Sequence, residues 1–285
     1  MTKFSEADLV LNRDGSVYHL NLKPENVSKN IIVVGDPGRV YRVSKHFDKI
    51  EFEMNKREFI THTGTYKGKR FTVLSTGMGV DNIEIAIVEL DALFNIDLKE
   101  RIPRKEKESF NIVRIGTSGA IQEELKVGSQ VLSVYGIGMD NLMLYYNLPQ
   151  TEFEREIGKQ LKRELNLPFE PYVVKGSERL MAKFGEGLIE GNTVTSPGFY
   201  GPQGRKLRIP VKNPKFLSQI TTFHYENFWL TNFEMETSMI YAFARLLGHE
   251  ALSINAILGN RAKGTFSKNP YKTIDSIIVK VLDRF

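Results

Sequence analysis

The sequence predicts an α/β protein: a single domain over residues 1–285, built as a three-layer α/β/α sandwich with a mixed central β-sheet. Short apolar runs rich in β-branched residues alternate with amphipathic helical patterns along the whole chain. No linker-like or low-complexity segment interrupts this alternation. The polar, chemically suggestive segments each follow an apolar run. Ligands of such sheets gather where strands end, so we expect these segments to share one site.

Composition narrows the class of protein. The 285 residues are 41% hydrophobic, which is enough for a sizeable core. The net charge of +5 favours an anionic substrate but is too small to indicate nucleic acid. There is no cysteine, which excludes disulfides and zinc–thiolate sites, and the five histidines show no metal-ligand spacing. We therefore expect a cytoplasmic protein with no metal site, no nucleic-acid partner and no membrane span.

The first buried strand is predicted at residues 31–34, an Ile-Ile-Val-Val run. It leads directly into residues 35–39, Gly-Asp-Pro-Gly-Arg, and a helical pattern follows. A turn between a strand and a helix presents free backbone N–H groups to an anion, and Arg39 can add positive charge. An ordinary strand-to-helix turn fits the same residues equally well.

Two paired strands are predicted next, at residues 58–63 and 70–74. A second strand-to-turn break follows at residues 75–79. Asp81 or Asn82 is a plausible N-cap for the amphipathic helix after it. The two glycines of this break are a partial dinucleotide fingerprint whose third glycine would fall at Asn82, so a Rossmann cofactor site is not predicted.

In the segment at residues 111–119, NIVRIGTSG, a short apolar run is followed directly by a charged residue, Arg114. Arg114 lies where we expect a buried strand to end, and residues 116–119 are expected to form a Gly-Thr-Ser-Gly turn. A buried guanidinium is costly unless an anion meets it. The segment is therefore either an oxyanion pocket, most simply for phosphate, or a strand end with Arg114 paired to a nearby carboxylate.

The rest of the chain continues the same alternation. The expected elements are a solvated loop at 97–109, a strand at 128–134, a helix at 151–165, an extended connection at 209–230, a helix that opens with residues 232–238 and has Met235 on its apolar face, a strand at 252–258 and a closing helix. The closing helix has Ile274, Ile277, Ile278, Val281 and Leu282 on one face.

The loop at residues 191–208 combines glycine and proline with three side chains suited to a flat ring. Phe199 can stack on a ring, the Gln203 amide both donates and accepts, and Arg205 offers paired donors. They suit a planar heterocycle with adjacent carbonyls and a ring N–H, although a mobile surface loop is the alternative. The two glutamates around Met235 either complement a helix dipole or hold a polyhydroxyl ligand such as a sugar.

In this order, the segments resemble the nucleoside phosphorylase family, whose members act on purine nucleosides and uridine. The matching segments are 18–19, 35–39, 57–59, 75–79, 114–119, 234–236 and 260–261. Residues 199–205, FYGPQGR, resemble the uracil-recognition loop of uridine phosphorylases. The purine branch uses an aspartate after the last strand, whereas residues 251–274 contain no acidic residue.

The resemblance implies a role for each matched position. The implied phosphate ligands are Gly35, Arg39, Arg114, Thr117 and, from a neighbouring subunit, Arg57. The implied ribose ligands are Met235, Glu236 and the neighbouring subunit's His19. The implied base ligands are Phe199, Gln203, Arg205 and Arg261. Arg114, Glu236 and Arg205 would be the catalytic residues.

The resemblance also implies a pentosyltransferase that catalyses reversible phosphorolysis of uridine, and of deoxyuridine or thymidine, with phosphate as co-substrate and no cofactor. It implies a homo-oligomer, a dimer or a trimer of dimers, with active sites shared across the interface. Some relatives bind a monovalent cation through a Glu and a Ser. Glu58 matches, but Asn82 stands where the Ser is expected, so the resemblance leaves the cation undecided. The alternatives are a purine nucleoside phosphorylase, a water-using nucleosidase of this fold, and a non-catalytic nucleoside-binding protein.

Overall fold

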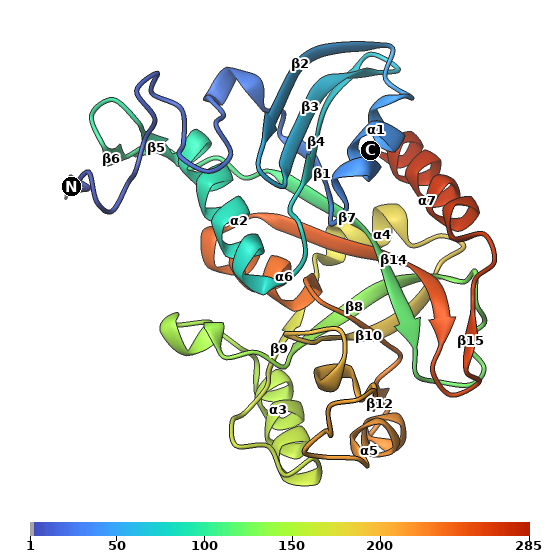
Figure 1. Cartoon of the computed structure of the whole chain (residues 1–285). Coiled ribbons are helices and arrows are strands. Elements are labelled where there is room, and N and C mark those ends of the chain that lie inside the picture. The colour runs from blue at the N-terminus through green and yellow to red at the C-terminus, as the bar shows by residue number, and fades with distance from the viewer. Residues whose placement is uncertain (1–2) are drawn as a thin grey trace.

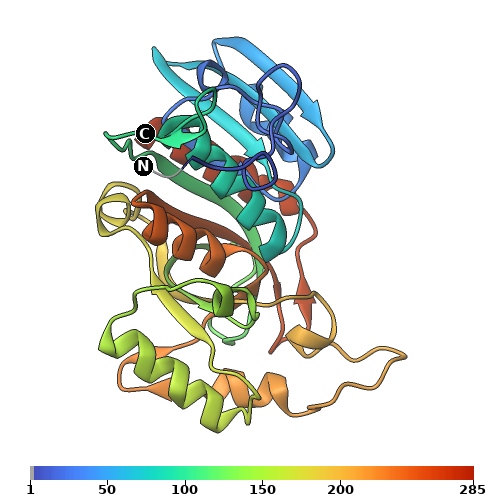
Figure 2. The ribbon, with the colours of Figure 1, turned by 90° about the vertical axis from the view of Figure 1, so that its left-hand side faces the viewer.

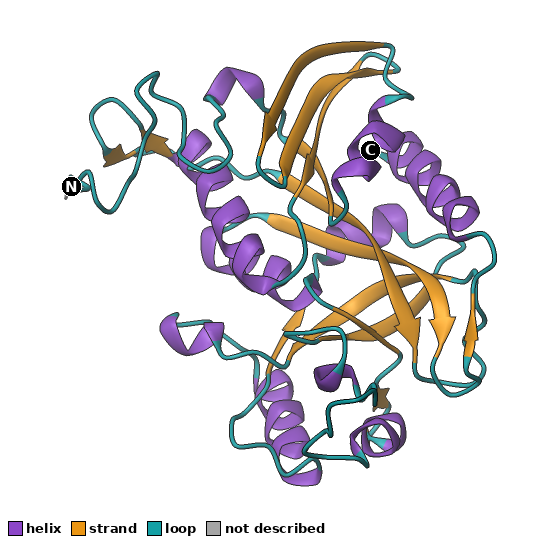
Figure 3. Cartoon of the chain, in the orientation of Figure 1, coloured by secondary structure: helices purple, strands orange, loops and turns teal. Residues whose placement is uncertain are grey.

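A computed structural model describes residues 3–285 and shows a mixed α/β fold (Figure 1). Within these residues, an 11-stranded sheet containing parallel and antiparallel pairs forms the centre. Helices lie on both sides of it (Figure 3). The predicted α/β class with a mixed central sheet is confirmed. Across the described residues, no helix combines the length and apolarity needed to cross a membrane.

The α-helices are α1 (Pro37–Ser44), α2 (Val80–Asn95), α3 (Glu152–Glu164), α4 (Glu178–Phe184), α5 (Phe216–Thr222), α6 (Thr237–Leu247) and α7 (Pro270–Arg284). The strands of the large sheet are β1 (Asn30–Val34), β2 (Lys49–Lys56), β3 (Phe59–Tyr66), β4 (Lys69–Ser75), β7 (Asn111–Ala120), β8 (Gln130–Gly138), β9 (Tyr172–Lys175), β10 (Ile189–Thr195), β13 (Asn232–Glu234), β14 (Glu250–Asn260) and β15 (Thr265–Phe266). Two small hairpins are β5–β6 (Ile96–Asp97 and Ile102–Pro103) and β11–β12 (His224–Tyr225 and Phe228–Trp229). Short 3₁₀ turns occupy Pro24–Asn26, Leu142–Tyr145 and Gly201–Gln203.

The sheet is half closed and half open. Its strand order is β15-β14-β8-β10-β13-β7-β1-β4-β3-β2, with β9 added beside β8. Because β14 pairs with both β8 and β7, the strands β14, β8, β10, β13 and β7 close on themselves, while β1, β4, β3 and β2 extend outward. Strand β7 belongs to both halves, and it carries Arg114. Arg114 therefore lies where the closed and open halves of the sheet meet.

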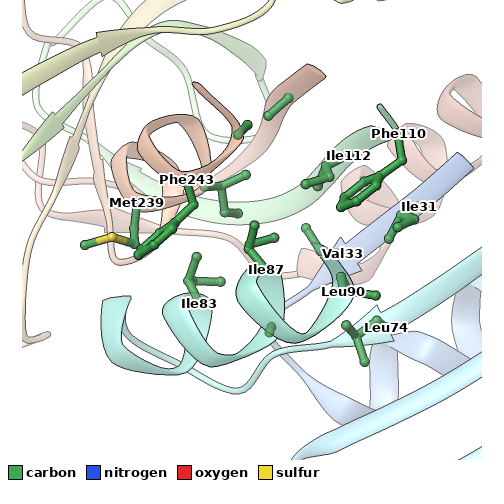
Figure 4. Close-up of a cluster of buried hydrophobic side chains, with 14 of the residues drawn as sticks. Ile31, Val33, Leu74, Ile83, Ile87, Leu90, Phe110, Ile112, Met239 and Phe243 are labelled. Carbon is green, nitrogen blue, oxygen red and sulfur yellow. The ribbon is translucent and has the colours of Figure 1, made fainter. Parts of the chain in front are cut away.

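Two buried cores hold the helices against the sheet. Along β1, Ile31 and Val33 pack into a core with α2 and α6 (Figure 4), whereas Ile32 and Val34 pack into a second core with α1, α4 and α7. A strand buried on both faces reads as a continuous apolar run, which explains why the Ile-Ile-Val-Val pattern predicts β1 correctly. Burying each such side chain contributes about 1.5–3 kcal/mol. A third core joins α3 and α5 to the closed half (Figure 2).

The prediction of a turn at residues 116–119 is wrong. These residues continue β7 to Ala120, so Arg114 lies inside the strand and not at its end. The cause is that β7 is paired with neighbouring strands along both of its edges. The first half of β7 is held by β1 and β14, and its second half remains paired with β14 and also meets β13. Backbone groups that would be left unpaired in a turn are therefore satisfied in the sheet.

Four other local predictions also need correction. Helix α2 is capped by Gly79 at φ 104°, not by Asp81 or Asn82, because glycine tolerates that backbone angle. Residues 232–234 form β13, and α6 begins only at Thr237. The connection at 209–230 contains α5 and the β11–β12 hairpin, and the 97–109 loop contains part of the β5–β6 hairpin. Helices α3 and α7 are confirmed.

Candidate active site

Arg114 is the centre of a buried polar cluster on β7. Its Nη2 lies 2.6 Å from Glu236 and 3.1 Å from Glu234. Its Nη1 donates to Asn255 Oδ1 at 2.7 Å and to Ser253 Oγ at 3.3 Å. Its side chain is 5% exposed. Three of the four hydrogens of the two Nη atoms are therefore donated to partners inside the protein, and Glu234 adds an ion-pair contact to Nη2.

Gly116 makes room for this guanidinium. Residues two apart on a strand point to the same face, so the Arg114 side chain passes over position 116. A Cβ at Gly116 would lie 1.7 Å from Arg114 Nη1 and 2.6 Å from Asn255 Oδ1. The glycine is thus required by the side chain packed on it, and not by a turn.

The two glutamates come from the junction between β13 and α6. Glu234 accepts the N–H groups of Glu236 and Thr237, each at 2.9 Å, and the hydroxyl of Thr195 at 2.6 Å. Glu236 accepts the N–H of Gly79 at 2.8 Å. The first backbone donors of a helix have no partner within the helix, so Glu234 caps α6 from outside while also holding Arg114.

A second arginine adds positive charge beside the first. Arg39 of α1 is 8% exposed and donates to the Ile115 carbonyl at 3.0 Å. Burial and the neighbouring Arg114 charge lower the pKa of Arg39 to about 10. Burial also raises the pKa of Glu236, against the opposing effect of Arg114. The pKa of Arg114 is raised because Glu234 and Glu236 outweigh its burial.

The glycine breaks after β1 and β4 lie next to each other. Val34 and Ser75 are paired at the ends of these parallel strands, and a Cβ at Gly35 would lie 3.3 Å from the Gly77 carbonyl. Glu58 and Asn82 both lie against Gly77. The strand ends that carry the Gly35 and Gly77 segments thus form one edge, as expected for a mixed sheet. Thr117 is partly buried on the neighbouring β7.

The residues expected to contact a base form a second group. The Arg205 guanidinium carbon lies 3.6 Å from the centre of the Phe199 ring, and its Nη1 donates to Gln203 Oε1 at 2.6 Å. Arg261 donates to the Gln203 carbonyl at 2.9 Å, which joins the loop to the end of β14. Burial and the Arg261 charge lower the pKa of Arg205 to about 10. A cavity of about 700 Å³ adjoins Arg205 and is lined by residues of 200–216.

His19 and Arg57 belong to a third group. His19 Nδ1 is 2.6 Å from Glu89 Oε1, and the Arg57 guanidinium carbon is 5.9 Å from the centre of the Tyr18 ring. Arg57 is exposed. The structure therefore groups Arg39, Arg114 and Glu236 in one place, and the four base-loop residues in another. The expected roles of all these residues stay predictions.

A family model described as the phosphorylase superfamily matches residues 29–280. The chain belongs to the phosphorylase superfamily. A uridine phosphorylase of Thermococcus kodakarensis is 28% identical over 98% of this chain and 91% of its own length. A DeoD-type purine nucleoside phosphorylase of Bacillus cereus is 26% identical over 93% of this chain and 97% of its own.

The structures of known relatives agree with this assignment. A Trypanosoma brucei nucleoside phosphorylase described as showing uridine phosphorylase activity has a TM-score of 0.87 and 29% identity, covering 97% of this chain and 99% of its own. A purine nucleoside phosphorylase of Toxoplasma gondii, at TM-score 0.64 and 21% identity over 95% of each chain, shares the fold. This phosphorylase is thus a pentosyltransferase of the nucleoside phosphorylase family, as the sequence predicts.

Three residues of this phosphorylase's central cluster, Ser253, Asn255 and Glu234, are absent from the site residues predicted from the sequence. Asn255 accepts a hydrogen bond from Arg114, and its signal is a polar residue inside the apolar run of β14. Glu234 contacts Arg114 directly, and its signal is its place two residues before Glu236. Asn255 and Glu234 contact Arg114 only because β14 and β13 each pair with β7.

Proposed function

We propose that this phosphorylase catalyses reversible phosphorolysis of uridine, giving uracil and ribose 1-phosphate. The arrangement of Gln203 and Arg205 carries the proposal. Uracil presents an N–H between two carbonyl oxygens. Because Arg205 donates to Gln203 Oε1, the amide nitrogen of Gln203 is the end left to donate to a carbonyl. Oε1 retains a lone pair for the ring N–H, and Arg205 can donate to the second carbonyl.

The remaining residues support a direct displacement by phosphate. Phosphate bound by Gly35, Arg39, Arg114 and Thr117 would attack C1′ while the bond from C1′ to the base nitrogen breaks. The sugar develops oxocarbenium character, as in glycoside cleavage, and Glu236 and Met235 would hold it. No residue needs to form a covalent intermediate. The leaving uracil takes negative charge, which Arg205 would stabilise.

Three features separate this proposal from its alternatives. Residues 251–274 contain no acidic residue, which disfavours a purine base. Two buried arginines, Arg39 and Arg114, suit an anionic co-substrate better than water. The two relatives described with uridine phosphorylase activity are 28% and 29% identical to this chain, against 26% and 21% for the two purine nucleoside phosphorylases. We also propose that the chain works as a homo-oligomer, in which Arg57 and His19 reach the active site of a neighbouring subunit.

A substrate panel tests the proposed function. The protein is incubated with uridine, thymidine, cytidine or inosine, each with and without phosphate, and the released base is measured by chromatography. Uracil should form from uridine only when phosphate is present. Cytidine should react at least ~100-fold more slowly, because its amino group offers a donor where Arg205 or Gln203 also donates. Hypoxanthine release from inosine, or uracil release without phosphate, would favour one of the alternatives.

A further inference from the structure

Glu234 is the most completely bonded carboxylate of the central cluster. Its two oxygens accept from the Thr195 hydroxyl and from the N–H groups of Glu236 and Thr237, and Arg114 lies 3.1 Å away. Its side chain is 1% exposed. Three of its four partners belong to fixed backbone or to the end of a neighbouring strand. The Glu234 carboxylate therefore has no freedom to move without disrupting the start of α6.

Glu236 is held by fewer bonds. Its oxygens accept one backbone N–H, from Gly79, and one guanidinium hydrogen, from Arg114. In this arrangement the Nη atoms of Arg114 donate three hydrogen bonds, to Asn255, Ser253 and Glu236, and Glu234 lies 3.1 Å from Nη2, so each Nη atom already has two protein oxygens beside it. A ligand that binds Arg114 through an Nη atom must therefore displace one of these partners.

We infer that Glu234 is a positioning residue for the reaction, one that retains Arg114 and the first turn of α6 while Glu236 exchanges its bond to Arg114 for the substrate. Phosphate takes the Nη2 hydrogen that Glu236 releases, and the ribose hydroxyls donate to Glu236 in place of Arg114. This inference rests on the proposed function for the identity of the sugar. Glu234 itself touches no substrate. Its effect passes through Arg114 and Glu236.

The exchange links the two binding events. Without an anion, Glu236 is satisfied by Arg114 and gains little from a ribose. With an anion on Arg114, a buried Glu236 carboxylate lacks a donor until the ribose supplies one. Anion binding and nucleoside binding therefore strengthen each other, and the linkage is the same in both directions.

The test uses Glu234→Gln with a matched control, Glu154→Gln. Glu154 is also 1% exposed, also accepts two backbone N–H groups, from Thr151 and Lys175, and also pairs with an arginine, Arg245. It lies on α3, outside the cluster. Sulfate serves as the unreactive phosphate analogue. Calorimetry measures sulfate affinity alone, then uridine affinity with and without saturating sulfate, and kinetics measure kcat/KM for uridine with phosphate.

The expected pattern separates positioning from stability. Glu234→Gln should weaken sulfate binding and lower kcat/KM by about 10–100-fold, as loss of an outer partner does in other sites. In the wild type, sulfate should tighten uridine binding by at least ~5-fold, and the variant should lose this coupling. Glu154→Gln should lower the melting temperature comparably and leave sulfate affinity, coupling and kcat/KM unchanged. Thr195→Val, which removes one donor to Glu234, should shift sulfate affinity in the same direction by a smaller factor.

Two outcomes overturn the inference: wild-type sulfate affinity and coupling in Glu234→Gln, or equal losses of sulfate affinity in Glu234→Gln and Glu154→Gln. If Glu234→Gln does not fold, the Thr195→Val variant takes its place as the test. Wild-type sulfate affinity and coupling in Thr195→Val would then overturn the inference. Sulfate titration involves no nucleoside. A protein that releases no uracil from uridine therefore contradicts the proposed function alone.

Discussion

Replacing Gly116 with alanine should disable the central cluster although it removes none of the cluster's polar groups. The added Cβ would lie 1.7 Å from Arg114 Nη1, 2.4 Å from its Cζ and 2.6 Å from Asn255 Oδ1. The alanine cannot relieve these close contacts by changing rotamer, because no side-chain torsion angle moves a Cβ. A small shift of the backbone costs about 1–3 kcal/mol of overpacking strain. Expelling the guanidinium instead leaves buried Glu234 and Glu236 unpaired, at about 3–5 kcal/mol.

We therefore expect Gly116→Ala to lower the free energy of unfolding by at least about 2 kcal/mol and kcat/KM by at least ~100-fold. Urea unfolding at fixed protein concentration, followed by circular dichroism, measures the free energy of unfolding. The phosphorolysis assay measures kcat/KM. Gly119→Ala is the stability control on the same strand, since its Cβ would meet nothing closer than 3.8 Å. It should change the free energy of unfolding by less than about 1 kcal/mol. A Gly116→Ala protein as stable and active as the wild type would refute the packing argument.

Three further predictions follow from other contacts. Arg205→Ala should lower kcat/KM for uridine by at least ~100-fold, the usual cost of losing one donor to a developing charge, and an unchanged rate would contradict the role of the loop in base binding. The pKa of Glu154 is lowered because hydrogen bonds from Arg245 and from two backbone N–H groups outweigh burial. This carboxylate therefore stabilises the fold above its unfolded pKa, and the contribution is lost as the pH falls through the folded pKa. Glu154→Gln should thus lose about 2 kcal/mol or more at pH 7 and converge with the wild type in acid, as urea titrations from pH 7 to 3 would show. Arg57→Ala should weaken phosphate affinity by about 10-fold, the effect of one charge-assisted hydrogen bond, and unaltered affinity in calorimetry would exclude Arg57 from the site.

The sequence predicts those elements whose pattern is decided locally. β1 is buried on both faces and reads as an unbroken apolar run, and α7 has an apolar stripe at helical spacing. Helix α3 has a capping box from Thr151 to Glu154 and a clear apolar face. Each of these is specified by residues close together in the chain, so no knowledge of the partners is needed.

The errors occur where distant residues decide the structure. Gly-Thr-Ser-Gly has the composition of a turn, yet it is a strand because β14 lies along its whole length and Arg114 occupies the space above Gly116. The short strand β13 is held by β10 and β7, and three residues offer too little pattern to separate it from the helix that follows. The same reason explains the missing site residues. Asn255 and Glu234 become partners of Arg114 only when β14 and β13 are placed beside β7.

The charge balance of the cluster bears on the expected oligomer. Two arginines, Arg39 and Arg114, face two carboxyl groups, Glu234 and Glu236, so with all four ionised the buried cluster is close to neutral before a ligand binds. A phosphate that entered with one or two negative charges would leave this region negative, which is costly where water is excluded. A third cation would offset this charge. In residues 3–285, Arg57 forms no ion pair with a carboxylate and lies exposed beside Tyr18. An arginine with no carboxylate partner among these described residues is suited to reach into a neighbouring site, which is the role that the family resemblance implies for it.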